Sequence, residues 1–132
     1  MADLRLHEFI DTLRQACDRS DAVTSYDIRV QDNATVKIRV LLVADAFIDV
    51  YYNPETGRCS FVLVRKGRRI YGADNAFIGW HVHPLENPEQ HIRTREVSFA
   101  DFLAVVEEWI QRETQYQQHR YKSQHSLRSG TS

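Results

Sequence analysis

The sequence contains no apolar run long enough to cross a membrane, and charged residues occur throughout its first twenty positions. A membrane-spanning helix needs about 20 consecutive apolar residues, and a secretory signal peptide needs an uninterrupted apolar segment near its start. We therefore expect a cytoplasmic protein that does not enter a membrane. The net charge of −1 excludes a surface that is basic throughout, although it leaves room for a local basic patch.

Cysteine is also scarce, and the two cysteines present, Cys17 and Cys59, do not form a Cys-x-x-Cys pair. We expect both to be free thiols, as is usual in a reducing compartment. A chain of 132 residues is long enough to bury a core without disulfides or a structural metal. No internal repeat is present, so one domain is the simplest organisation.

Two stretches have the apolar spacing of an amphipathic helix. The first follows Asp3, a potential cap, and ends near residues 18–21. The second begins at Ser98, where Ser98 and Asp101 have the spacing of a capping box. Its apolar stripe is wide enough to cover one face of a sheet and consists of Phe99, Phe102, Leu103, Val106, Trp109 and Ile110.

Between the helices lie short segments with alternating polar and apolar residues, which is typical of half-buried strands. Short turns separate them and favour an antiparallel meander. The sequence therefore predicts an α+β domain over residues 1–112, with a five- to six-stranded antiparallel sheet flanked by an N-terminal and a C-terminal helix. The polar residues 113–132 are expected to be a frayed or disordered tail.

The candidate site begins with the segment Phe77–His83, which we predict to be a strand that ends before Pro84. Alternation places His81 and His83 on one face, and Ile78, Trp80 and Val82 on the other. The Trp80 face is the natural core face. The face that carries the two imidazoles is therefore expected to point toward solvent, a cleft or a helix, and we expect the imidazoles to be exposed.

Asp74, Asn75 and His91 lie near this histidine pair in the sequence and complete the candidate catalytic set. Histidine titrates near neutral pH and suits proton transfer, and a carboxylate such as Asp74 can orient an imidazole. A plain turn at Asp74–Asn75, structural histidines, and metal ligation are the alternatives. Because His81 and His83 lack a strong second ligand pair, we expect no stoichiometric zinc and no cofactor.

A second candidate site is the basic hairpin at residues 65–71. Its four cations could contact phosphates, and Tyr71 could stack on a base. The alternative is a solvated hairpin whose charges protect a sheet edge from association. The residues concerned are Arg65, Lys66, Arg68, Arg69 and Tyr71.

The letters His81-Val82-His83-Pro84 and Ser98-Phe99-Ala100-Asp101 resemble the HxHP and SxxD motifs of the JAMM metalloproteases. Here 13 residues separate Pro84 from Ser98, roughly double that family's spacing, and helix capping already explains Ser98 and Asp101. A metal-dependent hydrolase is therefore the least favoured alternative.

A broader resemblance covers residues 26–110. The Asp74-Asn75 pair, His81-x-His83, a short loop and a C-terminal helix follow a meander containing DAFIDVYYNPETGRCSFVLVRKGRRIYG. This arrangement resembles the TumE family of small prokaryotic toxin–antitoxin toxins. That family typically has an arginine and an aromatic residue before the Asp-Asn pair, where this chain has Gly72-Ala73.

The TumE resemblance implies a cytoplasmic toxin that acts on RNA and is neutralised by an antitoxin protein. Together with the histidine pair, it favours a metal-independent ribonuclease, because imidazoles beside a cation can assist attack of a 2′-hydroxyl on phosphate. The alternative is a non-enzymatic protein-interaction module in which the histidines are structural.

Overall fold

A computed structural model describes residues 2–31, 34–77, 79–85, 87 and 89–129. Seven strands form one antiparallel sheet in which sequence order equals spatial order, and a helix lies at each end of the described chain. The elements are α1 (Ala2–Asp18), β1 (Val23–Val30), β2 (Val36–Leu42), β3 (Ala46–Tyr52), β4 (Cys59–Arg65), β5 (Arg68–Asp74), β6 (His81–His83), β7 (Ile92–Arg93) and α2 (Phe99–Ser129).

The α+β class and the antiparallel meander predicted from the sequence are confirmed. The sheet has seven strands rather than five or six, because the short strand β7 pairs with β6. A two-residue strand is too short to produce a recognisable alternation in the sequence.

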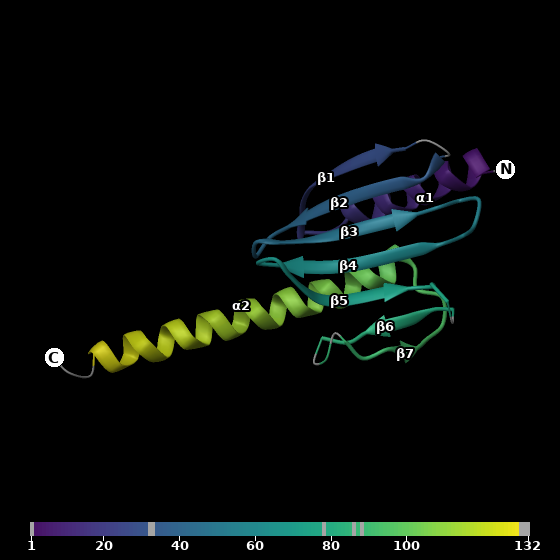
Figure 1. The fold of residues 1–132 in the computed structure, drawn as a ribbon. Coiled ribbons are helices and arrows are strands. Elements are labelled where there is room, and N and C mark those ends of the chain that lie inside the picture. Colours follow the sequence, from purple (N-terminus) through teal and green to yellow (C-terminus); the bar gives the residue numbers. More distant parts are fainter. Residues whose placement is uncertain (1, 32–33, 78, 86, 88, 130–132) are drawn as a thin grey trace.

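Both helices lie on the same side of the sheet, behind it in the view of Figure 1. We call this the covered face, and its opposite the open face. Alternation along β2 shows the division, since its buried residues face the helices and its exposed residues lie on the open face. The core lies between sheet and helices, and its largest fully buried side chains include Leu13, Ile38, Ile48, Phe61, Leu63 and Phe102.

Helix α1 begins at Ala2, so Asp3 lies inside its first turn and not at the cap position predicted. The buried side of α1 carries the expected apolar residues, and Phe9 stacks on Tyr52 of β3 with ring centroids 4.2 Å apart. Cys17 and Cys59 are both free and buried. Burial raises the pKa of the Cys59 thiol to about 12.

Helix α2 starts as predicted. The Asp101 amide donates to Ser98 Oγ at 3.0 Å, and the Ser98 amide donates to Asp101 Oδ2 at 3.3 Å, which is a reciprocal capping box. The helix continues to Ser129, past the expected boundary at residue 112, and projects beyond the sheet (Figure 1). Gln, Glu, Arg and Lys are good helix formers even without an apolar stripe. No helix in the described ranges is long and apolar enough to span a membrane.

The segment before β6 differs from the prediction. The strand begins at His81 and not at Phe77, because Phe77 and Gly79 have φ angles of 63° and 90°, which do not belong to a strand. Ile78 lies outside the described residues. The predicted break at Gly72–Asn75 is also shorter, since β5 continues through Asp74.

Candidate active site on the open face of the sheet

Pairing between neighbouring strands aligns polar residues in a row across the open face. Each residue in this row lies directly opposite the next one on the adjacent strand. From β1 to β7, the row consists of Arg29, Lys37, Tyr51, Ser60, Asp74, His81 and Arg93. The candidate histidines therefore lie on the same face of the sheet as cations and an aromatic residue from distant strands.

Asp74 joins the two histidines of β6. Its Oδ1 lies 3.2 Å from His81 Nε2, and its Oδ2 lies 3.4 Å from His83 Nε2. The Ala76 amide also donates to Asp74 Oδ1 at 3.0 Å, which fixes the orientation of the carboxylate. The predicted role of Asp74 in orienting an imidazole is thus geometrically available for both rings.

His91, in the segment before β7, lies beside His81 and His83. Its ring centroid lies 5.2 Å from that of His81 and 4.4 Å from that of His83. The potential ligand atoms of these three histidines all lie within 4.8 Å of one another. We call His81, His83, His91 and Asp74 the histidine–aspartate cluster.

His81 and His83 lie on the face opposite Val82, as alternation predicted, but their expected exposure was wrong. Their exposed fractions are only 4% and 8%, because His91 and the neighbouring strand pack against them. Trp80 is half-buried on the core side, where it stacks on Phe61 with ring centroids 6.2 Å apart. Strand alternation correctly separated the two faces but carried no information about what covers each one.

Gly72 provides space for the cluster. It lies opposite His83 in the register, and a Cβ atom at this position would meet His83 Cδ2 at 3.5 Å and the Phe61 carbonyl oxygen at 3.4 Å. A Cβ atom at this position would therefore be in van der Waals contact with the His83 ring.

Asn75 does not belong to the cluster. Its Oδ1 accepts a hydrogen bond from the Cys59 amide at 2.9 Å, and its Nδ2 donates to the Gly57 carbonyl at 2.8 Å. These bonds hold the turn between β3 and β4 against the end of β5. Both ends of the amide are therefore used in a structural role at this turn, and the catalytic role of Asn75 stays a prediction.

The basic hairpin is divided between the two sides of the molecule. Arg65 pairs with Glu113 of α2 at 3.1 Å and lies over the Trp109 ring, and Tyr71 stacks on Phe102 with ring centroids 5.0 Å apart. Both therefore pack toward α2 on the covered face and are not positioned for phosphate or base contacts. Lys66, Arg68 and Arg69 remain exposed at the turn.

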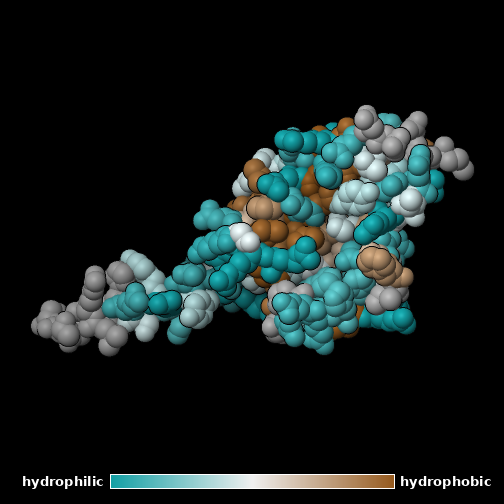
Figure 2. Space-filling model, viewed as in Figure 1, coloured by the Kyte–Doolittle hydropathy of each residue, from teal (hydrophilic) through white to brown (hydrophobic). Residues whose placement is uncertain are grey.

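The sequence did not identify the surface beside the cluster. A depression of about 490 Å³ on the open face is lined by Arg29, Lys37, Tyr51 and Ser60, among others. Arg29 pairs with Asp27 at 2.9 Å, whereas Lys37 has no ion-pair partner among the described residues. In Figure 2, apolar residues gather over the middle of this face and hydrophilic ones surround them.

Lys37 alternates with the buried residues of β2, and Tyr51 alternates with those of β3. This alternation is a signal for the surface in the sequence. Each pattern alone indicates an ordinary solvent-facing side chain. Only the strand register aligns these side chains with the cluster.

The chain matches no protein-family model, no curated protein and no solved structure.

Proposed function

We propose that the protein is a toxin-type ribonuclease that binds single-stranded RNA on the open face of its sheet and cleaves it at the histidine–aspartate cluster. One observation carries this proposal. The register aligns Lys37 and Tyr51 with Asp74 and His81, so a binding surface and a reactive centre share one face.

Open sheet faces bind single-stranded RNA by stacking bases on aromatic side chains and by pairing phosphates with cations. Tyr51 supplies the aromatic ring, and Lys37 supplies the cation beside it. Lys37 lies four strands from His81, or roughly 19 Å at about 4.8 Å per strand. A short oligonucleotide that crosses the strands can therefore contact the depression and the cluster together.

The cluster has the groups that phosphodiester cleavage needs. Imidazoles transfer protons or hold a metal ion, and Arg93, opposite His81 in the register, can stabilise negative charge on a phosphate. The metal-independent chemistry expected from the sequence uses the imidazoles for proton transfer.

The TumE resemblance supports the toxin assignment and an antitoxin partner. Co-expression with the product of the neighbouring gene tests this partner.

RNA affinity tests the binding surface. Tyr51→Ala is expected to weaken binding of a short single-stranded RNA by about 1–3 kcal/mol, the usual value for one stacked base. Lys37→Ser should remove one phosphate contact. The slope of log affinity against log salt concentration should therefore become less steep by about 0.7. The matched control is Lys66→Ser in the hairpin, which should change neither quantity.

Affinity and salt dependence should be measured by fluorescence anisotropy at several salt concentrations. If Lys66→Ser weakens binding while Tyr51→Ala and Lys37→Ser leave it unchanged, RNA binds at the hairpin and the open face is not the site.

A further inference from the structure

The histidine–aspartate cluster has the composition of a transition-metal site. Three imidazoles and one carboxylate converge from β5, β6 and the segment before β7. Imidazole nitrogen suits zinc, copper, iron and nickel, whereas magnesium and calcium prefer sites made of oxygen ligands. Of the six histidines in the chain, three lie in this one cluster.

The hydrogen bonding of His81 directs its second ring nitrogen at the Asp74 carboxylate. Its Nδ1 lies 2.9 Å from the Gly79 carbonyl oxygen. A carbonyl can only accept, so Nδ1 carries the hydrogen and donates it. Nε2 then faces Asp74 Oδ1 at 3.2 Å, and two lone pairs at this distance repel unless a proton or a metal ion lies between them. A backbone carbonyl that holds the second ring nitrogen is the usual support of a metal-binding histidine.

The distances agree with a tetrahedral ion. Zinc bonds of about 2.0–2.1 Å place neighbouring ligand atoms about 3.3 Å apart. The contact from His81 Nε2 to Asp74 Oδ1, at 3.2 Å, and the contact from His83 Nε2 to Asp74 Oδ2, at 3.4 Å, each have about this separation, through one oxygen of the carboxylate in each case. The separations among the three imidazoles reach up to 4.8 Å. The imidazoles would therefore have to approach one another by up to about 1.5 Å to bind one ion, and His91 is the exposed member of the three.

We propose that the protein binds one zinc ion through His81 Nε2, His83 Nε2, a ring nitrogen of His91 and the Asp74 carboxylate. The expectation of no zinc rested on the lack of a second strong ligand pair in the sequence, whereas the fold brings His91 and the Asp74 carboxylate to the two histidines of β6. This site stands on the cluster geometry and does not depend on RNA binding. If the proposed ribonuclease activity exists, the ion would act as a Lewis acid at the phosphodiester.

Zinc affinity of protein made without a histidine tag tests the site. After removal of metal with a chelator, the wild-type protein should bind about one zinc per chain in competition with a chromophoric chelator. His91→Ala and Asp74→Asn should weaken binding at least about 10-fold, the lower end of effects seen when metal sites lose a supporting group. His7→Ala, on the exposed side of α1, is the matched control and should leave affinity unchanged.

His91→Ala is informative because this exposed side chain can be removed without unfolding the protein. Cobalt(II) added to wild-type protein should give the intense visible absorption of tetrahedral coordination, and His91→Ala should lose it. Affinity that is the same in wild type, His91→Ala and Asp74→Asn would overturn the proposal, as would zinc binding that disappears in His7→Ala. RNA affinity measured on the same proteins separates the two proposals, since zinc binding without RNA binding contradicts only the proposed function.

Discussion

Asp74→Asn is expected to reduce RNA cleavage by about 10²–10⁴-fold, because Asp74 orients imidazoles whose acid–base catalysis usually contributes a factor of this size. The asparagine keeps the size of the side chain and the oxygen that accepts from the Ala76 amide. It removes the charge that faces His81 and His83 at 3.2 and 3.4 Å. The fold should therefore persist while the cluster loses its function.

The matched control is Asp11→Asn on the exposed side of α1, which should cleave at the wild-type rate. Cleavage of a labelled single-stranded RNA and thermal unfolding should be measured on both variants. Wild-type cleavage by Asp74→Asn would show that the cluster is not the reactive centre. It would favour the alternative in which the histidines are structural and the protein acts by interaction alone.

Substitution of Phe61 is expected to have the largest effect on stability. This side chain is 1% exposed and contacts Trp80, Phe99 and Phe102, with ring centroids 5.4–6.2 Å apart. It therefore connects β4 both to α2 and to the segment that leads into the cluster. Phe61→Ala should lower the free energy of unfolding by about 3–5 kcal/mol, through lost burial and the cavity that remains.

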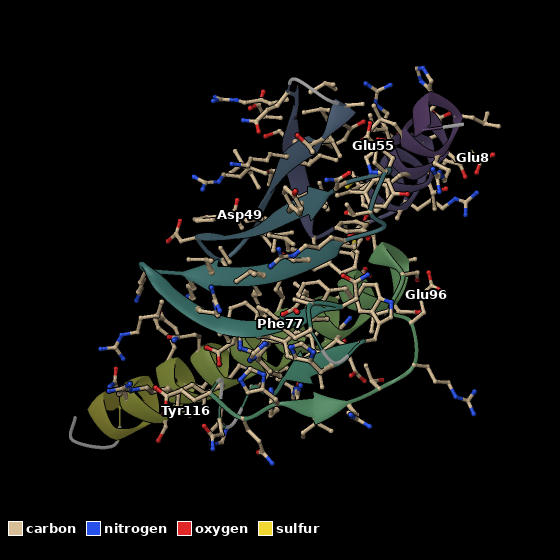
Figure 3. All side chains as sticks on the ribbon, turned by 45° about the vertical axis from the view of Figure 1, so that its right-hand side comes forward. Glu8, Asp49, Glu55, Phe77, Glu96 and Tyr116 are labelled. Carbon is tan, nitrogen blue, oxygen red and sulfur yellow. The ribbon has the colours of Figure 1, made fainter. Side chains whose placement is uncertain are left out.

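Phe77→Ala provides the same chemical change at a fully exposed position and should leave the free energy of unfolding within about 0.5 kcal/mol of wild type. Denaturant titrations of the two variants give the comparison. Equal stability of Phe61→Ala and Phe77→Ala would contradict the placement of the core between the sheet and α2. The labelled Phe77 in Figure 3 marks the control position.

The features that the sequence predicted correctly depend on local patterns. Apolar alternation identified β2 and β3, the Ser98–Asp101 spacing identified the start of α2, and alternation placed Val82 opposite the two histidines of β6. Each of these follows from side-chain direction within one element or from a hydrogen bond across one turn. Local information of this kind is present in a single stretch of chain.

The features that were missed depend on contacts between stretches. His91 reaches the cluster because the chain reverses between β6 and β7, and Asp74 faces His81 because of the register between β5 and β6. Arg65 turns toward Glu113, 48 positions away in the chain, which no local pattern indicates. Burial of His81 and His83 follows from the same long-range packing.

The central claim is that RNA binds on the open face and reaches the histidine–aspartate cluster. Backbone amide NMR shifts, recorded as a short single-stranded RNA is added, test it most directly. We expect the shifted amides to lie in β2, β3 and β4 around Lys37, Tyr51 and Ser60, and to continue to His81 and Arg93. Shifts confined to the turn at Lys66–Arg69 or to α1 and α2, with the open face unchanged, would contradict the claim.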